Sequence, residues 1–192
     1  SYGGAAALRV AASRPERIAS VSLYEPSAFH LLRQLGQQAE AELCEIEDVA
    51  RSLVDGLSNG AYVQAASAFV DYWNGAGCWA SLREPVRALL VRWLPHAALH
   101  FHALFCETTP LAAMRFPAPL LVVRGEHARP PSRLLADLLA SEIGGRAAEC
   151  VPGAGHMGPV THAETVNALI ANHIATAQAA LPSFDLHTRN AA

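Results

Sequence analysis

Lysine is absent from this sequence: all 14 basic residues are arginine, against 17 aspartate and glutamate residues, which gives a formal charge of −3. A weakly acidic chain has no electrostatic footprint for a phosphate backbone, so nucleic acid is not expected as a partner. The sequence also has no run of about 18 uncharged apolar residues, so we expect no membrane-spanning helix.

Cysteine is scarce, and its spacing shows no pairs. With no signal peptide ahead of the first strand, this usage favours a reducing, cytoplasmic location. We expect the thiols to be small buried hydrophobic groups and not nucleophiles. The four residues are Cys44, Cys78, Cys106 and Cys150.

Three short apolar runs, at 18–24, 120–124 and 147–151, predict buried strands because each is bounded by turn residues. Helical periodicity separates and follows them, which predicts an α/β fold with a parallel sheet flanked by helices. One helix should begin at Pro130 and end before Gly144. The last should begin at Thr161, which has capping-box spacing to Glu164, and carry Val166, Leu169, Ile170 and Ile174 on one face.

The segment 31–109 contains no convincing strand and predicts helices at 39–57 and 62–73, with two more between 79 and 105. Eight of the 13 aromatic residues fall between positions 62 and 105. A helical insertion of this kind between strands indicates a cap over a pocket. For most of the aromatics, packing inside the cap is the favoured interpretation.

These patterns divide the chain into four parts. Residues 1–30 supply a helix and strand of the core, 31–109 the cap, 110–178 two further strands with their helices, and 179–192 a C-terminal tail.

The loop 153–158, Gly-Ala-Gly-His-Met-Gly, places His156 just beyond the end of the third predicted strand. Sites in parallel sheets form at this edge, and a histidine can act there as a general base. Met157 is expected to pack beneath the loop.

At the other end of the chain, Ser1-Tyr2-Gly3-Gly4 leads into a helix of small residues. A serine followed by two residues ending in glycine matches the latter part of a G-x-S-x-G nucleophile elbow.

Taken in order, these segments resemble the C-terminal portion of an α/β-hydrolase, beginning at the nucleophile elbow. The resemblance covers the elbow, the strand ending at Glu25-Pro26, the cap, the strand ending at Gly125-Glu126 and the histidine loop. It implies a partial α/β-hydrolase fold in which the N-terminal half of the sheet is absent. It also implies an esterase-like serine hydrolase that acts through an acyl-enzyme and needs no cofactor.

Carried onto this sequence, the resemblance makes Ser1 the nucleophile, His156 its general base and the backbone N–H of Tyr2 an oxyanion-hole donor. The acid is left open. The commoner position in the family, beyond the second strand seen here, holds Ala128. Glu25 is the favoured acid, Glu126 is the alternative, and a site without an acid is the third possibility.

Other polar residues are weaker candidates. Asp71 is expected at the cap surface or hinge, and His127 and His162 are secondary candidates for lining the pocket. His96, His100 and His102 lie close together, yet no Cys or carboxylate has matching spacing, so cap packing or a solvated face is favoured over a metal site.

The implied substrate is a small to medium apolar acyl compound; ester, lactone, thioester and C–C bond chemistry all remain open. We expect the 192 residues to be a fragment that hydrolyses a short ester poorly or not at all by itself. An alternative is a non-catalytic or partner-assembled module that associates through the open sheet edge. An N-terminal-nucleophile hydrolase is a third, less favoured interpretation.

Overall fold

The computed structural model describes residues 1–180 and contains one small sheet whose strands lie in the order β1, β2, β3, all parallel. The predicted α/β arrangement of three parallel strands flanked by helices is therefore confirmed. The outer strands start later than predicted, and in β1 this is because Ile18 still belongs to the turn of the preceding 3-10 helix. The strands are β1 (Val21–Tyr24), β2 (Leu120–Gly125) and β3 (Glu149–Val151).

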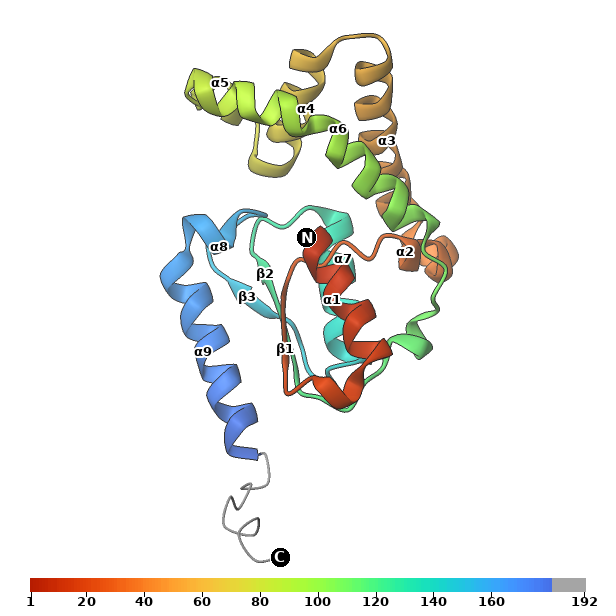
Figure 1. The fold of residues 1–192 in the computed structure, drawn as a ribbon, viewed down its shortest axis with the longest axis vertical. Helices are drawn as coiled ribbons and strands as arrows, with labels where there is room; N and C mark the ends of the chain where they lie inside the picture. The colour runs from red at the N-terminus through yellow and green to blue at the C-terminus, as the bar shows by residue number, and fades with distance from the viewer. Residues whose placement is uncertain (181–192) are drawn as a thin grey trace, which may run out of the picture.

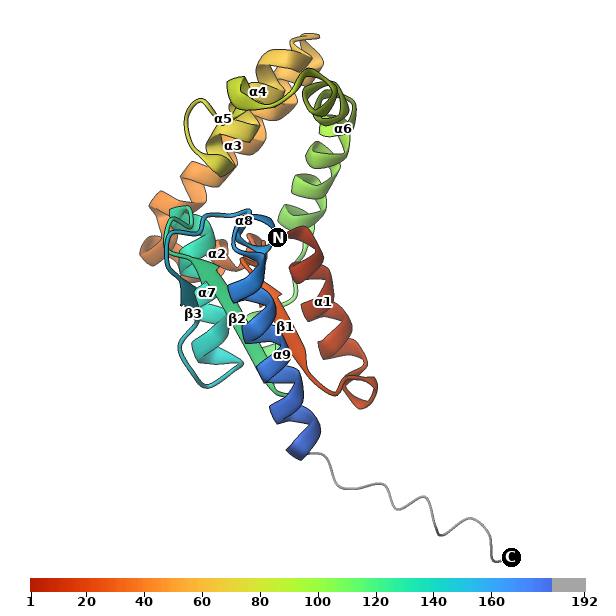
Figure 2. The same cartoon turned by 90° about the vertical axis from the view of Figure 1, so that its left-hand side faces the viewer.

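Helices account for most of the described chain, as Figures 1 and 2 show. In chain order the helical elements are α1 (Tyr2–Ser13), η1 (Pro15–Arg17), α2 (His30–Leu35), η2 (Gly36–Ala39), α3 (Glu40–Ser58), α4 (Tyr62–Asn74), α5 (Cys78–Ser81), α6 (Glu84–Cys106), η3 (Leu111–Met114), α7 (Pro130–Glu142), α8 (Gly158–Thr161) and α9 (Ala163–Ala180).

The two faces of β2 enter different hydrophobic clusters because successive side chains of a strand point to opposite sides. Leu120 and Val122 share one cluster with buried residues of α1 and α7. Leu121 and Val123 share the other with α9. Both faces of the central strand are thus covered, which explains its continuous apolar run.

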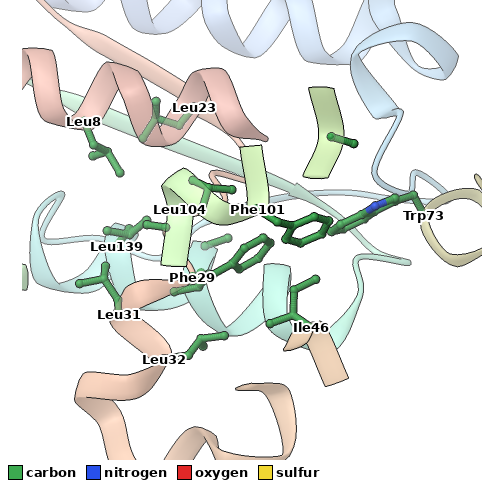
Figure 3. Close-up of a cluster of buried hydrophobic side chains, with 14 of the residues drawn as sticks. Leu8, Leu23, Phe29, Leu31, Leu32, Ile46, Trp73, Phe101, Leu104 and Leu139 are labelled. Atoms are coloured by element: carbon green, nitrogen blue, oxygen red, sulfur yellow. The ribbon is translucent and has the colours of Figure 1, made fainter. Parts of the chain in front are cut away.

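Helices α3 to α6 form the cap that the sequence predicts, and they stand over the carboxyl ends of the strands (Figures 1 and 2). Cap and core share one hydrophobic cluster. At its centre, Phe29 stacks on Phe101 of α6 with ring centroids 5.9 Å apart, and both side chains appear in Figure 3. This shared packing fixes the cap over the strand ends.

The region 79–105 holds two helices, as predicted, but they are unequal: the one-turn helix α5 is followed by the 23-residue helix α6. Other predicted boundaries are wrong. Thr161 does not cap the last helix; it ends α8, and its hydroxyl donates to the carbonyl of Met157. Helix α9 continues to Ala180, two residues into the predicted tail, and the rest of that tail lies outside the described residues.

The buried face of α9 also differs from the prediction at one position. Val166 is buried and Leu169 and Ile170 pack beside it, but Ile174 is 41% exposed and His173 is buried in its place.

Within residues 1–180, no helix combines the length and the apolar character that crossing a bilayer requires.

Candidate active site

A cavity of about 900 Å³ lies between the cap and the carboxyl ends of the strands. Ser1, Ser27 and His156 line it from the core side, and helices α4 and α6 supply most of its apolar wall. The three polar side chains come from the start of α1, the loop after β1 and the loop after β3. The edge of the sheet where sites form in parallel folds is therefore where the cavity lies.

Four of the eight aromatic residues between 62 and 105 line this cavity. Six of the eight belong to the hydrophobic cluster or pack against it, so packing accounts for most of them as expected, and some of these also face the cavity. The four that line the cavity are Phe69, Trp73, Trp93 and Phe101.

Glu25 and His156 form a buried pair. Oε2 of Glu25 lies 2.7 Å from Nδ1 of His156, and the Glu25 side chain is fully buried while that of His156 is 10% exposed. Oε1 of Glu25 accepts a hydrogen bond of 3.0 Å from the N–H of Gly125. Because an ionised carboxylate can only accept, this arrangement places the imidazole proton on Nδ1 and leaves Nε2 free to accept.

The backbone of Glu25 is strained. Its φ of +41° is in the left-handed region, and it is the one residue other than glycine with a positive φ among those described. Such a conformation costs about 1–3 kcal/mol and persists where its surroundings hold it. Here the N–H of Glu25 donates to the carbonyl of Val123 at 3.0 Å, while the side chain is held by Gly125 and His156.

The loop that carries His156 is held against the ends of β1 and β2. The hydroxyl of Tyr24 donates to the carbonyl of Gly155 at 2.6 Å. Burial, with a smaller contribution from the Glu25 carboxylate, raises the pKa of Tyr24 far above its usual value, so the phenol keeps its proton. Gly158 packs directly against the Tyr24 ring, where a Cβ would collide with the hydroxyl.

Gly125 is a second point of close approach. A Cβ at this position would overlap the carbonyl oxygen of Ala154 and lie 2.6 Å from its carbonyl carbon. We expect Gly125→Ala to lower the free energy of unfolding by about 3 kcal/mol, because backbone atoms must shift to relieve the overlap. For a chain of this length the corresponding fall in the melting temperature is about 6–12 °C.

Thermal unfolding followed by circular dichroism measures this effect. Gly155→Ala in the same loop is the matched control, because a Cβ there would have no neighbour within 4 Å. Equal melting temperatures for the two variants would show that the contact between β2 and the histidine loop is not tight.

Ser1 lies at the start of α1, next to the loop that follows β1. Its hydroxyl is 3.1 Å from that of Ser27, its nitrogen donates to the carbonyl of Tyr24 at 2.8 Å, and its carbonyl accepts from the N–H of Gly4 at 2.8 Å.

The structure thus brings Ser1 and His156 to one cavity without joining them. Within the described residues the Ser1 hydroxyl is bonded to Ser27, and no hydrogen bond links it to His156. Tyr2 is the first residue of α1, so its N–H has no acceptor within the helix and lies at the positive end of the helix dipole.

Trp73 is a neighbour of His156 that the sequence does not single out. The two rings lie 4.3 Å apart at 32°, and Trp73 is 8% exposed. Arg129, at the start of α7, donates from Nε to the carbonyl of Tyr72 and from Nη2 to that of Asp71 at 3.3 Å, while its guanidinium lies over the Tyr72 ring. A core arginine therefore holds the end of α4 from which Trp73 contacts the histidine.

The alternative acid lies elsewhere. Glu126 is exposed and accepts from the N–H of Gly153 at 2.7 Å, so it orders the turn before the histidine loop. Neither His127 nor His162 is among the residues that line the cavity. Met157, expected beneath the loop, is instead 44% exposed and lines the cavity.

Asp71 holds the cap together: its carboxylate accepts from the N–H of Trp79 at 2.7 Å and so joins α4 to α5.

The three clustered histidines have separate neighbours. His96 contacts the carbonyl of Trp93, His100 stacks on the Tyr2 ring at 4.0 Å, and His102 lies 3.7 Å from the sulfur of Cys106. Within residues 1–180, no three His, Cys, Asp or Glu side chains gather in a way that could hold a metal ion.

The prediction of buried cysteines is wrong. All four are free thiols; Cys78 is half-buried, and the exposed ones are Cys44, Cys106 and Cys150.

Comparison with models of protein families, with curated proteins and with solved structures found no match to this chain.

Proposed function

We propose that this protein is a serine hydrolase that cleaves a carboxylic ester or related acyl substrate through an acyl-enzyme, on a partial α/β-hydrolase fold. The observation that carries the proposal is the buried pair of Glu25 and His156 at the cavity that Ser1 also lines. A strained, fully buried carboxylate that orients a histidine is a costly arrangement, and such strain gathers at functional sites.

In the proposed reaction, Nε2 of His156 takes the proton of the Ser1 hydroxyl as its oxygen bonds to the carbonyl carbon. The same proton then passes to the departing alcohol, and the acyl group stays on Ser1. Water attacks this ester next, giving up one proton to His156, which returns it to Ser1 as the acid product leaves. The Ser1 hydroxyl must first exchange its bond with Ser27 for one with His156.

Glu25 would act through the histidine. The Glu25 carboxylate accepts the hydrogen bond from Nδ1 of His156. It thereby fixes the orientation of the imidazole ring and stabilises the imidazolium that forms during both steps. The N–H of Tyr2, at the start of α1, would donate to the developing oxyanion.

The free edge of β1 supports a second candidate, a module that pairs with another chain. Among the described strands β1 has one neighbour, β2, so its other edge presents unpaired backbone groups. A dimer in solution that dissociates when β1 is interrupted by Ser22→Pro would favour this candidate. The parallel sheet and the helix directly after Ser1 give no support to an N-terminal-nucleophile hydrolase.

Titration with a fluorophosphonate tests the serine hydrolase proposal. It is carried out on the full protein, meaning the intact protein that contains these residues. We expect about one equivalent to react covalently and hydrolysis of 4-nitrophenyl octanoate to fall in proportion, because an activated serine alone attacks this phosphorus. Heat-denatured protein is the control and should not react. Hydrolysis that continues in excess reagent would contradict a serine nucleophile.

A further inference from the structure

We propose that the cavity selects an uncharged acyl group with a long apolar chain, and that it rejects a chain of the same length that ends in a carboxylate. This inference rests on the proposed function and adds the substrate class. It depends on where the polar groups of the cavity lie and on how each of them is already bonded.

Most polar groups that can meet a substrate lie at the core end of the cavity, where Ser1, Ser27 and His156 are gathered and where His100 of α6 stacks on the Tyr2 ring. Two polar side chains elsewhere in the lining are bonded to their own helices. Asn74 donates to the carbonyl of Val70 at 2.9 Å, and Thr161 donates to that of Met157 at 3.2 Å. A ligand therefore finds most of its hydrogen-bond partners at one end of the cavity.

No arginine, aspartate or glutamate side chain is among the residues that line the cavity, and its two histidines are already in contact with other side chains: His156 with the Glu25 carboxylate and His100 with the Tyr2 ring. The nearby guanidinium of Arg129 is held by backbone carbonyls of Asp71 and Tyr72. The Ser1 nitrogen donates to the carbonyl of Tyr24 at 2.8 Å. A carboxylate deep beneath the cap would therefore meet no arginine and would give up its hydration against a mostly apolar wall, which is unfavourable.

The volume of about 900 Å³ is near the upper end of the range of roughly 300–1,000 Å³ for ligand sites. Leu82, Val86 and Leu90, from α6 and the residues before it, extend the apolar wall well beyond the catalytic end. Each additional buried methylene should raise kcat/KM about fourfold until the space is filled. An acyl chain of eight carbons therefore tests whether the apolar wall contributes to substrate binding.

The experiment compares 4-nitrophenyl octanoate with the mono-4-nitrophenyl ester of octanedioic acid at pH 8. We expect kcat/KM of the full protein to be at least about 100-fold higher for the octanoate ester, because only the other substrate must bury a charge. Values within about threefold of each other would overturn the inference and leave the proposed function intact.

A reciprocal variant sharpens this test. Leu90→Arg places a cation on the cavity wall and should shift the preference toward the octanedioate ester by at least about tenfold. Leu89→Arg is the matched control: Leu89 is the next residue of α6 but is 57% exposed and does not line the cavity. Equal shifts in the two variants would assign the preference to surface charge and contradict the inference.

Binding separates the inference from the reaction. In Ser1→Ala, octanamide should quench the fluorescence of Trp73 and Trp93 with at least about tenfold higher affinity than the monoamide of octanedioic acid. If Ser1→Ala shows this preference and the unaltered protein hydrolyses neither ester, the cavity selects as inferred and the proposed function fails. If neither amide binds, the inference fails.

Discussion

Replacing Glu25 by glutamine should lower the turnover number for ester hydrolysis by about 10³- to 10⁴-fold while leaving the fold intact. The new side chain keeps one oxygen, which the N–H of Gly125 continues to occupy. Its amide NH₂ then faces Nδ1 of His156, and because an amide nitrogen can only donate, Nδ1 must become the acceptor. The proton moves to Nε2, and the histidine can no longer take the proton of Ser1.

Glu126→Gln is the matched control, since it alters the other carboxylate that the sequence offers. Glu126 is exposed and bonds only the backbone of Gly153 among the described residues, so turnover should stay within about threefold of the unaltered protein. Steady-state kinetics with 4-nitrophenyl octanoate measures both variants, and circular dichroism checks their folding. A larger loss in Glu126→Gln than in Glu25→Gln would assign the acid to Glu126.

Ser1→Ala should lower kcat/KM by at least about 10⁴-fold, because the covalent route is lost and only binding and oxyanion contacts remain. Ser27→Ala is the control that matters most. Ser27 is 2% exposed, lines the same cavity and lies 3.1 Å from the Ser1 hydroxyl, so it is the other hydroxyl that a substrate could meet.

In the proposed reaction Ser27 only holds the resting position of the Ser1 hydroxyl. Its removal should change kcat/KM by less than about tenfold, which is the effect of one neutral hydrogen bond. Progress curves with 4-nitrophenyl octanoate compare the two variants at equal protein concentration. A loss in Ser27→Ala as large as that in Ser1→Ala would mean that Ser27 takes part in the chemistry.

Features encoded in neighbouring residues could be predicted from the sequence. The three strands, the helical cap and the loop around His156 each depend on an apolar run or a glycine-rich turn, and all three occur in the structure. The capping box predicted at Thr161 is wrong because the pattern is short, and Thr161 is the last residue of the separate one-turn helix α8.

Features that depend on contacts between distant residues could not be predicted from local patterns. Glu25 and Glu126 both follow a strand, and it is the resemblance, not the local pattern, that favours Glu25; in the structure the packing of the β3 loop against β1 brings Glu25 to His156, which is 131 residues away. Trp73 and Arg129 show no local signal either, because the contact of Arg129 with Tyr72 spans 57 residues. The prediction that the cysteines are buried fails for a related reason, because the burial of a cysteine depends on which face of its helix or strand meets the core.

The central claim is that Ser1 carries the acyl group in a site organised by His156 and Glu25. Peptide mapping by mass spectrometry, after reaction of the full protein with a fluorophosphonate, tests it most directly. We expect a single adduct on Ser1, formed far more slowly in Glu25→Gln. An adduct on Ser27 or another residue, or one that forms equally fast without the Glu25 carboxylate, would contradict the claim.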